Sequence, residues 1–146
     1  MKAVIMAGGF GTRLRPLTPH LPKPLVPVGN VPIMEHTVRL LQRHGFTDLV
    51  VLLYFLPETI IAHFGDGAPW GVRMSYVTPT ADLGTAGAVK FAAGELAEPV
   101  LVISGDVITD FDLSAAVAFH RDCAAEATMV LTRVDSPLAY GIVITD

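Results

Sequence analysis

KAVIMAGGFGTRLRPLTPHLPKP, residues 2–24, joins an apolar segment to a glycine-rich turn and then to a series of cations. The apolar residues 2–6 predict a short buried strand. The chain has 14 acidic and 10 basic residues, yet its first acidic residue is Glu35. The cations of the region before it are Lys2, Arg13, Arg15 and Lys23. Charge sorted in this way favours a polyanionic ligand over a uniformly solvated surface.

The glycine-rich turn offers a way to hold phosphate. Gly8, Gly9 and Gly11 can adopt positive φ and let backbone N–H groups approach phosphate oxygens that a Cβ would keep away. A strand, such a turn and cations in this order match the crevice at the carboxyl end of a parallel sheet, where nucleotides bind. The turn satisfies neither G-x-x-x-x-G-K-[ST] nor G-x-G-x-x-G, which argues against a P-loop and against a dinucleotide site. A plain connector is the alternative interpretation.

Strands and helices alternate along the chain. The predicted strands are residues 2–6, 49–54, 72–76, 100–104 and 128–134, and the predicted helices are residues 32–44, 57–64, 85–96 and 113–123. The apolar runs 49–53 and 100–103 are typical of strands buried on both faces, and the strand at 72–76 is expected near an edge. The pattern predicts one α/β domain with a doubly wound, mostly parallel, Rossmann-like sheet.

Composition excludes several classes of protein. Hydrophobic residues make up 51% of the 146 residues, but no apolar run approaches the roughly 20 residues of a membrane span. The single cysteine, Cys123, rules out an intrachain disulfide and, with no secretory signal, predicts a cytoplasmic protein. The net charge of −4 argues against nucleic-acid binding. We therefore expect small-molecule ligands, with no nucleic-acid or membrane partner.

Asp106 is the second candidate for chemistry. The run VLVIS delivers Gly105 and Asp106 to the carboxyl end of a strand, at the edge that receives the glycine-rich turn. A carboxylate there can hold Mg²⁺ between phosphates. The alternative is a turn aspartate that stabilises its own loop. Asp112 is explained more simply as a helix cap, and the five histidines lack ligand spacing.

The segment LGTAGAV, residues 83–89, is the third candidate. Gly84 and Gly87 flank a predicted helix start, so backbone groups there can approach a nucleobase. Tight packing between the helix and the sheet is the alternative reason for these glycines. The sequence by itself leaves both interpretations open.

Taken together, these motifs resemble the sugar-phosphate nucleotidyltransferases, also called nucleotide-sugar pyrophosphorylases. The resemblance is carried by GGFGTRLRPLT, PKPLVPV, YFLPETIIAHFGDG, WGVRMSYV, LGTAGAV, VLVISGDVITDFDL and YGIVITD, in the order and spacing of that family. Within the family the chain is most similar to the mannose-1-phosphate guanylyltransferase branch. The resemblance implies a nucleotide-diphospho-sugar transferase fold, of which residues 1–146 are the N-terminal nucleotide-binding part, truncated at the C-terminus.

The resemblance also implies an activity and roles for individual residues. The reaction is Mg²⁺-assisted transfer of a nucleoside monophosphate from a nucleoside triphosphate to a sugar 1-phosphate, with GTP and mannose 1-phosphate favoured. Arg13 is expected to contact the β and γ phosphates, Lys23 to stabilise the transferring phosphate, and Asp106 to bind Mg²⁺. The implied nucleotide contacts are Ala7, Gly8, Gly9, Gly11, Thr12, Arg13, Leu83 and Gly84. Gly141, after Tyr140, is expected to lie against the sugar, unless it merely ends a loop.

Two departures from the family pattern shape our expectations. Residues 78–82, TPTAD, lack the acidic and proline pattern expected before LGTAG. The chain ends before the region in which such enzymes supply a second metal-binding aspartate and a lysine for the sugar phosphate. We therefore expect a piece that keeps nucleotide-binding groups, with catalysis impaired or absent, and a sheet surface that favours a homo-oligomer.

Two other functions compete with nucleotidyl transfer. A non-catalytic nucleotide-binding or regulatory module is the alternative that a truncated transferase fold allows. A dinucleotide-dependent oxidoreductase is suggested by fold class alone, and the missing G-x-G-x-x-G and the cations of the turn argue against it.

Overall fold

The computed structural model describes residues 1–14, 18, 20–95, 99–135, 141 and 143, with the side chains of Arg13, Ala93 and Glu95 left out. The chain forms two compact units, Met1–Phe111 and Asp112–Asp146.

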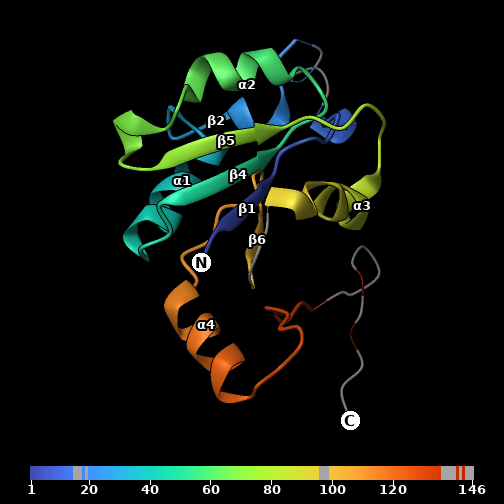
Figure 1. The fold of residues 1–146 in the computed structure, drawn as a ribbon. Helices are drawn as coiled ribbons and strands as arrows, with labels where there is room; N and C mark the ends of the chain where they lie inside the picture. Colours follow the sequence, from blue (N-terminus) through green and yellow to red (C-terminus); the bar gives the residue numbers. More distant parts are fainter. Residues whose placement is uncertain (15–17, 19, 96–98, 136–140, 142, 144–146) are drawn as a thin grey trace. The chain divides into compact units, whose positions relative to one another are not determined.

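A four-stranded parallel sheet forms the centre of the first unit (Figure 1). Its strands are β1 (Ala3–Met6), β4 (Asp48–Leu52), β5 (Arg73–Val77) and β6 (Leu101–Ser104). Their order in the sheet is β5-β4-β1-β6, so the chain runs outward from β1 to β5 and then returns to the other side of β1. This reversal creates a crevice at the carboxyl ends of β1 and β6, where α/β sheets bind ligands. The predicted parallel α/β architecture is confirmed.

Alternating apolar residues bury both faces of the two central strands. Val4 and its neighbour Val50 lie on one face, while Ile5 and Val51 lie on the other, and all four are 0% exposed. The prediction that residues 49–53 are buried on both faces is therefore confirmed. Full burial of each such side chain contributes about 1.5–3 kcal/mol, so these residues fix the position of both strands.

Helix α3 (Gly84–Phe91) covers the face of the sheet that carries Val4. Ala88 and Val89 of this helix pack against the cluster that contains Val4 and Leu52. The helix is shorter than predicted because its last turn tightens into the 3₁₀ helix η4 (Ala92–Glu95). The end of the predicted helix, at residue 96, lies outside the described residues.

A short hairpin leads the chain into helix α1 (Ile33–Arg43). Its strands are β2 (Pro27–Val28) and β3 (Val31–Pro32). The turn residues Gly29 and Asn30 both have positive φ, which a type I′ turn requires. The predicted apolar face of α1 is confirmed, because Ile33, Thr37, Leu40 and Leu41 are all buried.

Helix α2 (Pro57–Phe64) has the predicted bounds and ends at Gly65, whose φ is +54°. It lies beside α1, because Nε2 of His63 is 3.8 Å from a carboxylate oxygen of Glu35 on α1. Phe64 packs against Trp70 of the 3₁₀ helix η3 (Ala68–Trp70), with 5.0 Å between the ring centroids.

Strand β6 differs from its prediction. It is an edge strand rather than one buried on both faces, and Val102 remains 41% exposed. Among the described residues, no strand pairs with the outer edge of β6. An apolar run indicates a preference for a covered position, but only neighbouring elements supply the cover. The expected edge position of β5 is confirmed.

The second unit contains helix α4 (Leu113–Asp122). Asp112 caps this helix as predicted, since its Oδ1 accepts a hydrogen bond from the Ala115 N–H at 2.9 Å. The predicted strand at residues 128–134 is wrong: the structure has no regular element there. Met129, Val130 and Leu131 are 53% to 73% exposed. β propensity alone does not make a strand, because its backbone groups need hydrogen-bond partners from a neighbouring strand.

Across the described part of the chain, no helix is long and apolar enough to cross a membrane.

Candidate active site

A cavity of about 310 Å³ lies at the carboxyl ends of three strands. Met6, Leu52 and Ser104, the last residues of β1, β4 and β6, form part of its wall. The predicted site residues that line it are Ala7, Gly8, Gly9, Lys23, Leu83, Gly84 and Asp106. Segments far apart in the sequence therefore meet in one cavity at the edge of the sheet where the sequence predicts a site.

The three glycines of the turn serve different purposes. A Cβ on Gly8 would lie 3.1 Å from Cβ of Tyr54, so glycine lets the turn lie close to the end of β4. A Cβ on Gly9 would meet nothing within 4 Å, which leaves this backbone accessible. Gly11 has a φ of +62°, and its Cβ would lie 3.2 Å from Cβ of Lys23. The prediction of positive φ is confirmed for Gly11 and wrong for Gly8 and Gly9.

Lys23 and Asp106 form an ion pair, with 2.5 Å between Nζ and Oδ2. Lys23 begins the 3₁₀ helix η2 (Lys23–Leu25), in which Pro24 and Leu25 are buried. The buried neighbours anchor the backbone of Lys23, and its side chain extends to the cavity. The side chains of Lys23 and Asp106 are 32% and 28% exposed, so both remain accessible to a ligand.

The end of β6 fixes the position of Asp106. The Gly105 N–H donates a hydrogen bond to the Met6 carbonyl at 2.8 Å, which continues the pairing of β1 with β6. A Cβ on Gly105 would lie 3.0 Å from Cγ2 of Ile5, so glycine permits this close approach. The Ser104 hydroxyl donates to Oδ1 of Asp106 at 2.8 Å. Each carboxylate oxygen of Asp106 therefore has a defined partner.

These contacts keep Asp106 ionised. Partial burial by itself would raise the pKa of its carboxyl group. The hydrogen bonds from Lys23 and Ser104 and the positive charge of Lys23 act in the opposite direction. Their sum lowers the pKa of Asp106 below its ordinary value of 3.8. A carboxylate is thus present at neutral pH, as a role in metal binding requires.

The residues of the cavity suit a magnesium ion that is shared with the phosphates of a substrate. They do not suit a metal ion that is held by protein side chains alone. In the described part of the chain, no group of three His, Cys, Asp or Glu side chains is placed to hold a metal ion. Mg²⁺ commonly takes one or two carboxylates, several waters and the phosphates of a substrate. Asp106, in the wall of this cavity, would supply one carboxylate of that donor set.

Other predicted site residues do not line the cavity. Gly11 and Thr12 are absent from its wall, and Thr12 is exposed at the start of the 3₁₀ helix η1 (Thr12–Leu14). The side chain of Arg13, the whole of Arg15 and Tyr140 lie outside the described residues. Gly141 is an exposed residue of the second unit.

Phe10, Tyr54, Asp82 and Ser104 also line the cavity, although none of them was predicted as a site residue. Phe10, Tyr54 and Ser104 lie within motifs that carry the family resemblance, and Asp82 directly precedes another, so these positions were the available signal. Phe10 interrupts the glycine-rich turn, Asp82 directly precedes LGTAG, and Ser104 precedes Gly105. Tyr54 begins the motif YFLPETIIAHFGDG, but its place in the cavity wall depends on where β4 ends.

Comparison with known proteins agrees with this geometry. Residues 2–146 match the nucleotidyl transferase family. Mannose-1-phosphate guanyltransferase of Debaryomyces hansenii is 39% identical over 150 residues, which cover 100% of this chain and 41% of that protein. Mannose-1-phosphate guanylyltransferase of Mycobacterium tuberculosis is 39% identical over 145 residues, 99% of this chain and 40% of that protein. The chain thus spans about two-fifths of the length of these relatives.

A solved structure shares the same fold. HddC from Yersinia pseudotuberculosis, complexed with GMP-PN, matches with a TM-score of 0.74 and 27% sequence identity. The match covers 83% of this chain and 54% of that one. With a family match along nearly its whole length and a cavity built from the family motifs, the chain belongs to the nucleotidyl transferase family.

Proposed function

We propose that the chain is the nucleotide-binding part of an enzyme that transfers a nucleoside monophosphate from a nucleoside triphosphate to a sugar 1-phosphate. The observation that carries this proposal is the Lys23–Asp106 pair in a cavity walled by the glycine-rich turn. The names of the relatives support GTP and mannose 1-phosphate as the substrates.

The reaction needs no nucleophilic side chain. A sugar phosphate is already an anion at neutral pH, and its oxygen attacks the α-phosphorus of the nucleotide in line. The bond from the α-phosphorus to the bridging oxygen breaks, and its electron pair leaves with pyrophosphate. The protein has to bring two anions together and stabilise the charge that builds on the leaving group.

Residues of the cavity would supply these functions, together with Arg13 and Gly141, whose roles the family resemblance implies. Lys23 places a positive charge beside the transferring phosphate, and the accessible backbone at Gly9 approaches the phosphate oxygens. Arg13 would contact the β and γ phosphates, as the family resemblance implies. Asp106 would hold Mg²⁺, which would supply positive charge to offset the negative charge of the phosphates. Gly141 would contact the sugar.

A non-catalytic nucleotide-binding module is a second candidate. The cavity favours it, because the glycine-rich turn and Lys23 that line it are groups that nucleotide binding requires. Both candidates place the nucleotide in the same cavity. They differ in whether pyrophosphate is released.

Pyrophosphate release separates the two candidates. It should be measured across a panel of nucleoside triphosphates and sugar 1-phosphates, for this chain and for a longer chain that extends to the relatives' full length. We expect release from GTP with mannose 1-phosphate by the longer chain. Nucleotide binding without release by either chain would leave the binding module as the function.

A further inference from the structure

Asp82 places a second carboxylate in the wall of the cavity that is proposed to receive a polyanion. Its Oδ1 accepts a hydrogen bond from the Gly84 N–H at 3.0 Å. None of the ion pairs between described residues includes Asp82. A carboxylate offers about four acceptor positions, so most of the capacity of Asp82 is left for a ligand.

This carboxylate is unsuited to the phosphate end of a nucleotide. Like charges in a cavity of low polarity repel each other, so a phosphate beside Asp82 would weaken binding. The acceptors of Asp82 therefore suit the end of a nucleotide that carries hydrogen-bond donors and no charge.

Among the nucleobases, guanine presents the complementary edge. Its N1–H and N2 amino group are adjacent donors, which the two oxygens of a carboxylate can accept together. Adenine and cytosine each offer one donor beside a ring-nitrogen acceptor, and uracil offers one N–H between two carbonyl groups. A carboxylate pairs with two donors on guanine and would face an acceptor on each of the other bases.

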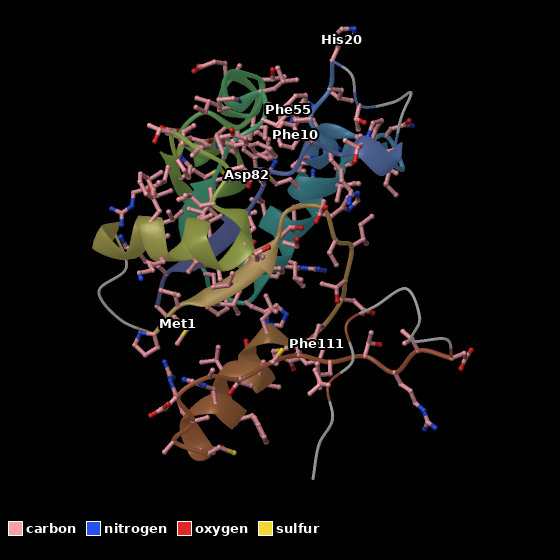
Figure 2. The ribbon with its side chains drawn as sticks, turned by 90° about the vertical axis from the view of Figure 1, so that its right-hand side faces the viewer. Met1, Phe10, His20, Phe55, Asp82 and Phe111 are labelled. Atoms are coloured by element: carbon pink, nitrogen blue, oxygen red, sulfur yellow. The ribbon has the colours of Figure 1, made fainter. Side chains whose placement is uncertain are left out.

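An aromatic ring in the same cavity offers a surface for the base. Phe10 is 47% exposed and lines the cavity with Asp82. It is held edge-on against Tyr54, with 5.6 Å between ring centroids and 88° between planes, and tilted against Phe55 at 5.4 Å. Figure 2 shows Phe10 beside Phe55, with Asp82 on the same part of the molecule. A supported and exposed ring of this kind suits stacking on a base.

We infer that Asp82 selects guanine, accepting hydrogen bonds from N1–H and the N2 amino group while Phe10 packs against the base. This inference rests on the proposed function, since it needs a nucleoside triphosphate in the cavity. The inference assigns the choice of base to Asp82. This residue belongs to the segment 78–82, which lacks the acidic and proline pattern of the family. Asp82 then selects the base, while Lys23 and the backbone of the glycine-rich turn hold the phosphates in the same cavity.

The test compares GTP with ITP, which keeps N1–H and lacks the N2 amino group. Dissociation constants for GTP, ITP, ATP and inorganic tripolyphosphate are measured by calorimetry for the unmodified chain, Asp82→Ala and Asp82→Asn. Asn keeps an acceptor for the Gly84 N–H but turns an amide donor toward the guanine donors. Asp66→Ala is the matched control, because Asp66 Oδ1 accepts from the Ala68 N–H at 3.0 Å in the same local geometry and does not line the cavity.

We expect the unmodified chain and Asp66→Ala to bind GTP about tenfold more tightly than ITP. Both Asp82 variants should bind GTP and ITP with similar affinity, while their affinity for tripolyphosphate is unchanged. An unchanged preference for GTP in Asp82→Ala would overturn the inference. Equal weakening of all three nucleotides would also overturn it, because that result assigns Asp82 to the ribose. If the unmodified chain binds tripolyphosphate but prefers no base, the inference about Asp82 is wrong and the proposed function stands. If the unmodified chain binds no triphosphate at all, the inference and the proposed function are both wrong.

Discussion

Nζ of Lys23 lies 2.5 Å from Oδ2 of Asp106, which joins a proline-rich segment to the end of strand β6. Both side chains line the cavity in which a nucleotide is proposed to bind. In the absence of a ligand, each therefore balances the charge of the other. A phosphate that pairs with Lys23 must break this ion pair. The same holds for a metal ion that binds Asp106.

Replacing Lys23 should slow nucleotidyl transfer far more than it affects folding. We expect Lys23→Met, in a longer chain that turns over, to lose on the order of 10²-fold or more in kcat, because a charge beside the transferring phosphate acts mainly in the transition state. Pyrophosphate release under saturating substrate is the measurement. Lys90→Met, which removes an exposed lysine from α3, is the control. Near-normal turnover by Lys23→Met would contradict the role given to Lys23.

The ion pair also makes a prediction about metal binding without nucleotide. Lys23→Met should bind Mn²⁺, a paramagnetic substitute for Mg²⁺, more tightly than the unmodified chain, because Asp106 no longer has a competing cation. Asp106→Asn should abolish the binding. Electron paramagnetic resonance of free Mn²⁺ measures both. If Lys23→Met bound Mn²⁺ more weakly, competition between lysine and metal for Asp106 would be ruled out.

The lowered pKa of Asp106 predicts how its contribution to stability depends on pH. Burial acts to raise this pKa, but Lys23 and Ser104 outweigh it, so folding favours the ionised form. The stabilisation is therefore fully present above the unfolded pKa of about 3.8 and is lost as pH falls through the lower folded pKa. We expect the difference in free energy of unfolding between the unmodified chain and Asp106→Asn to shrink below about pH 4. A difference that grows as the solution is acidified would have the wrong sign for this account.

Gly105→Ala tests how β6 positions Asp106. The added Cβ would lie 3.0 Å from Cγ2 of Ile5 and 3.2 Å from the Met6 carbonyl oxygen. We expect a loss of about 1–3 kcal/mol in stability from overpacking, together with weaker Mn²⁺ binding. Gly94→Ala is the control, because its Cβ would meet nothing within 4 Å. Urea unfolding measures stability. If Gly105→Ala kept both its stability and its Mn²⁺ binding, the strand ends would adjust without displacing Asp106.

The outer edge of β6 predicts self-association. Val102 is 41% exposed, and no described strand pairs with that edge, which leaves a template for pairing with another chain. Light scattering should show a mass that rises with protein concentration, and Val102→Lys should reduce the rise. Val28→Lys, at a residue of similar exposure on the β2 strand, should not. A uniform monomer at all concentrations would contradict the prediction.

Local sequence signals predicted the elements of the first unit well because its strands and helices carry their own start and stop residues. Pro57 and Gly65 bound α2, and the apolar run of β4 is covered on both faces. The prediction was wrong at residues 128–134 and for the burial of β6, where the outcome depends on neighbouring elements rather than on local residues. Lys23 and Asp106 were found from motifs at the same sheet edge. Asp82 and Ser104 were missed because their roles depend on the cavity that the fold builds beside them, which a motif by itself does not show.

The most direct test of the account is a titration of the isotopically labelled chain with GTP, followed by the backbone amide resonances. We predict that the resonances of Gly8, Gly9, Gly84 and Asp106 shift together along one saturating curve. Those of Arg39 and Gln42, which line a separate groove, should stay in place. Shifts confined to that groove, or no saturable shift around the cavity, would contradict the claim that this cavity binds the nucleotide.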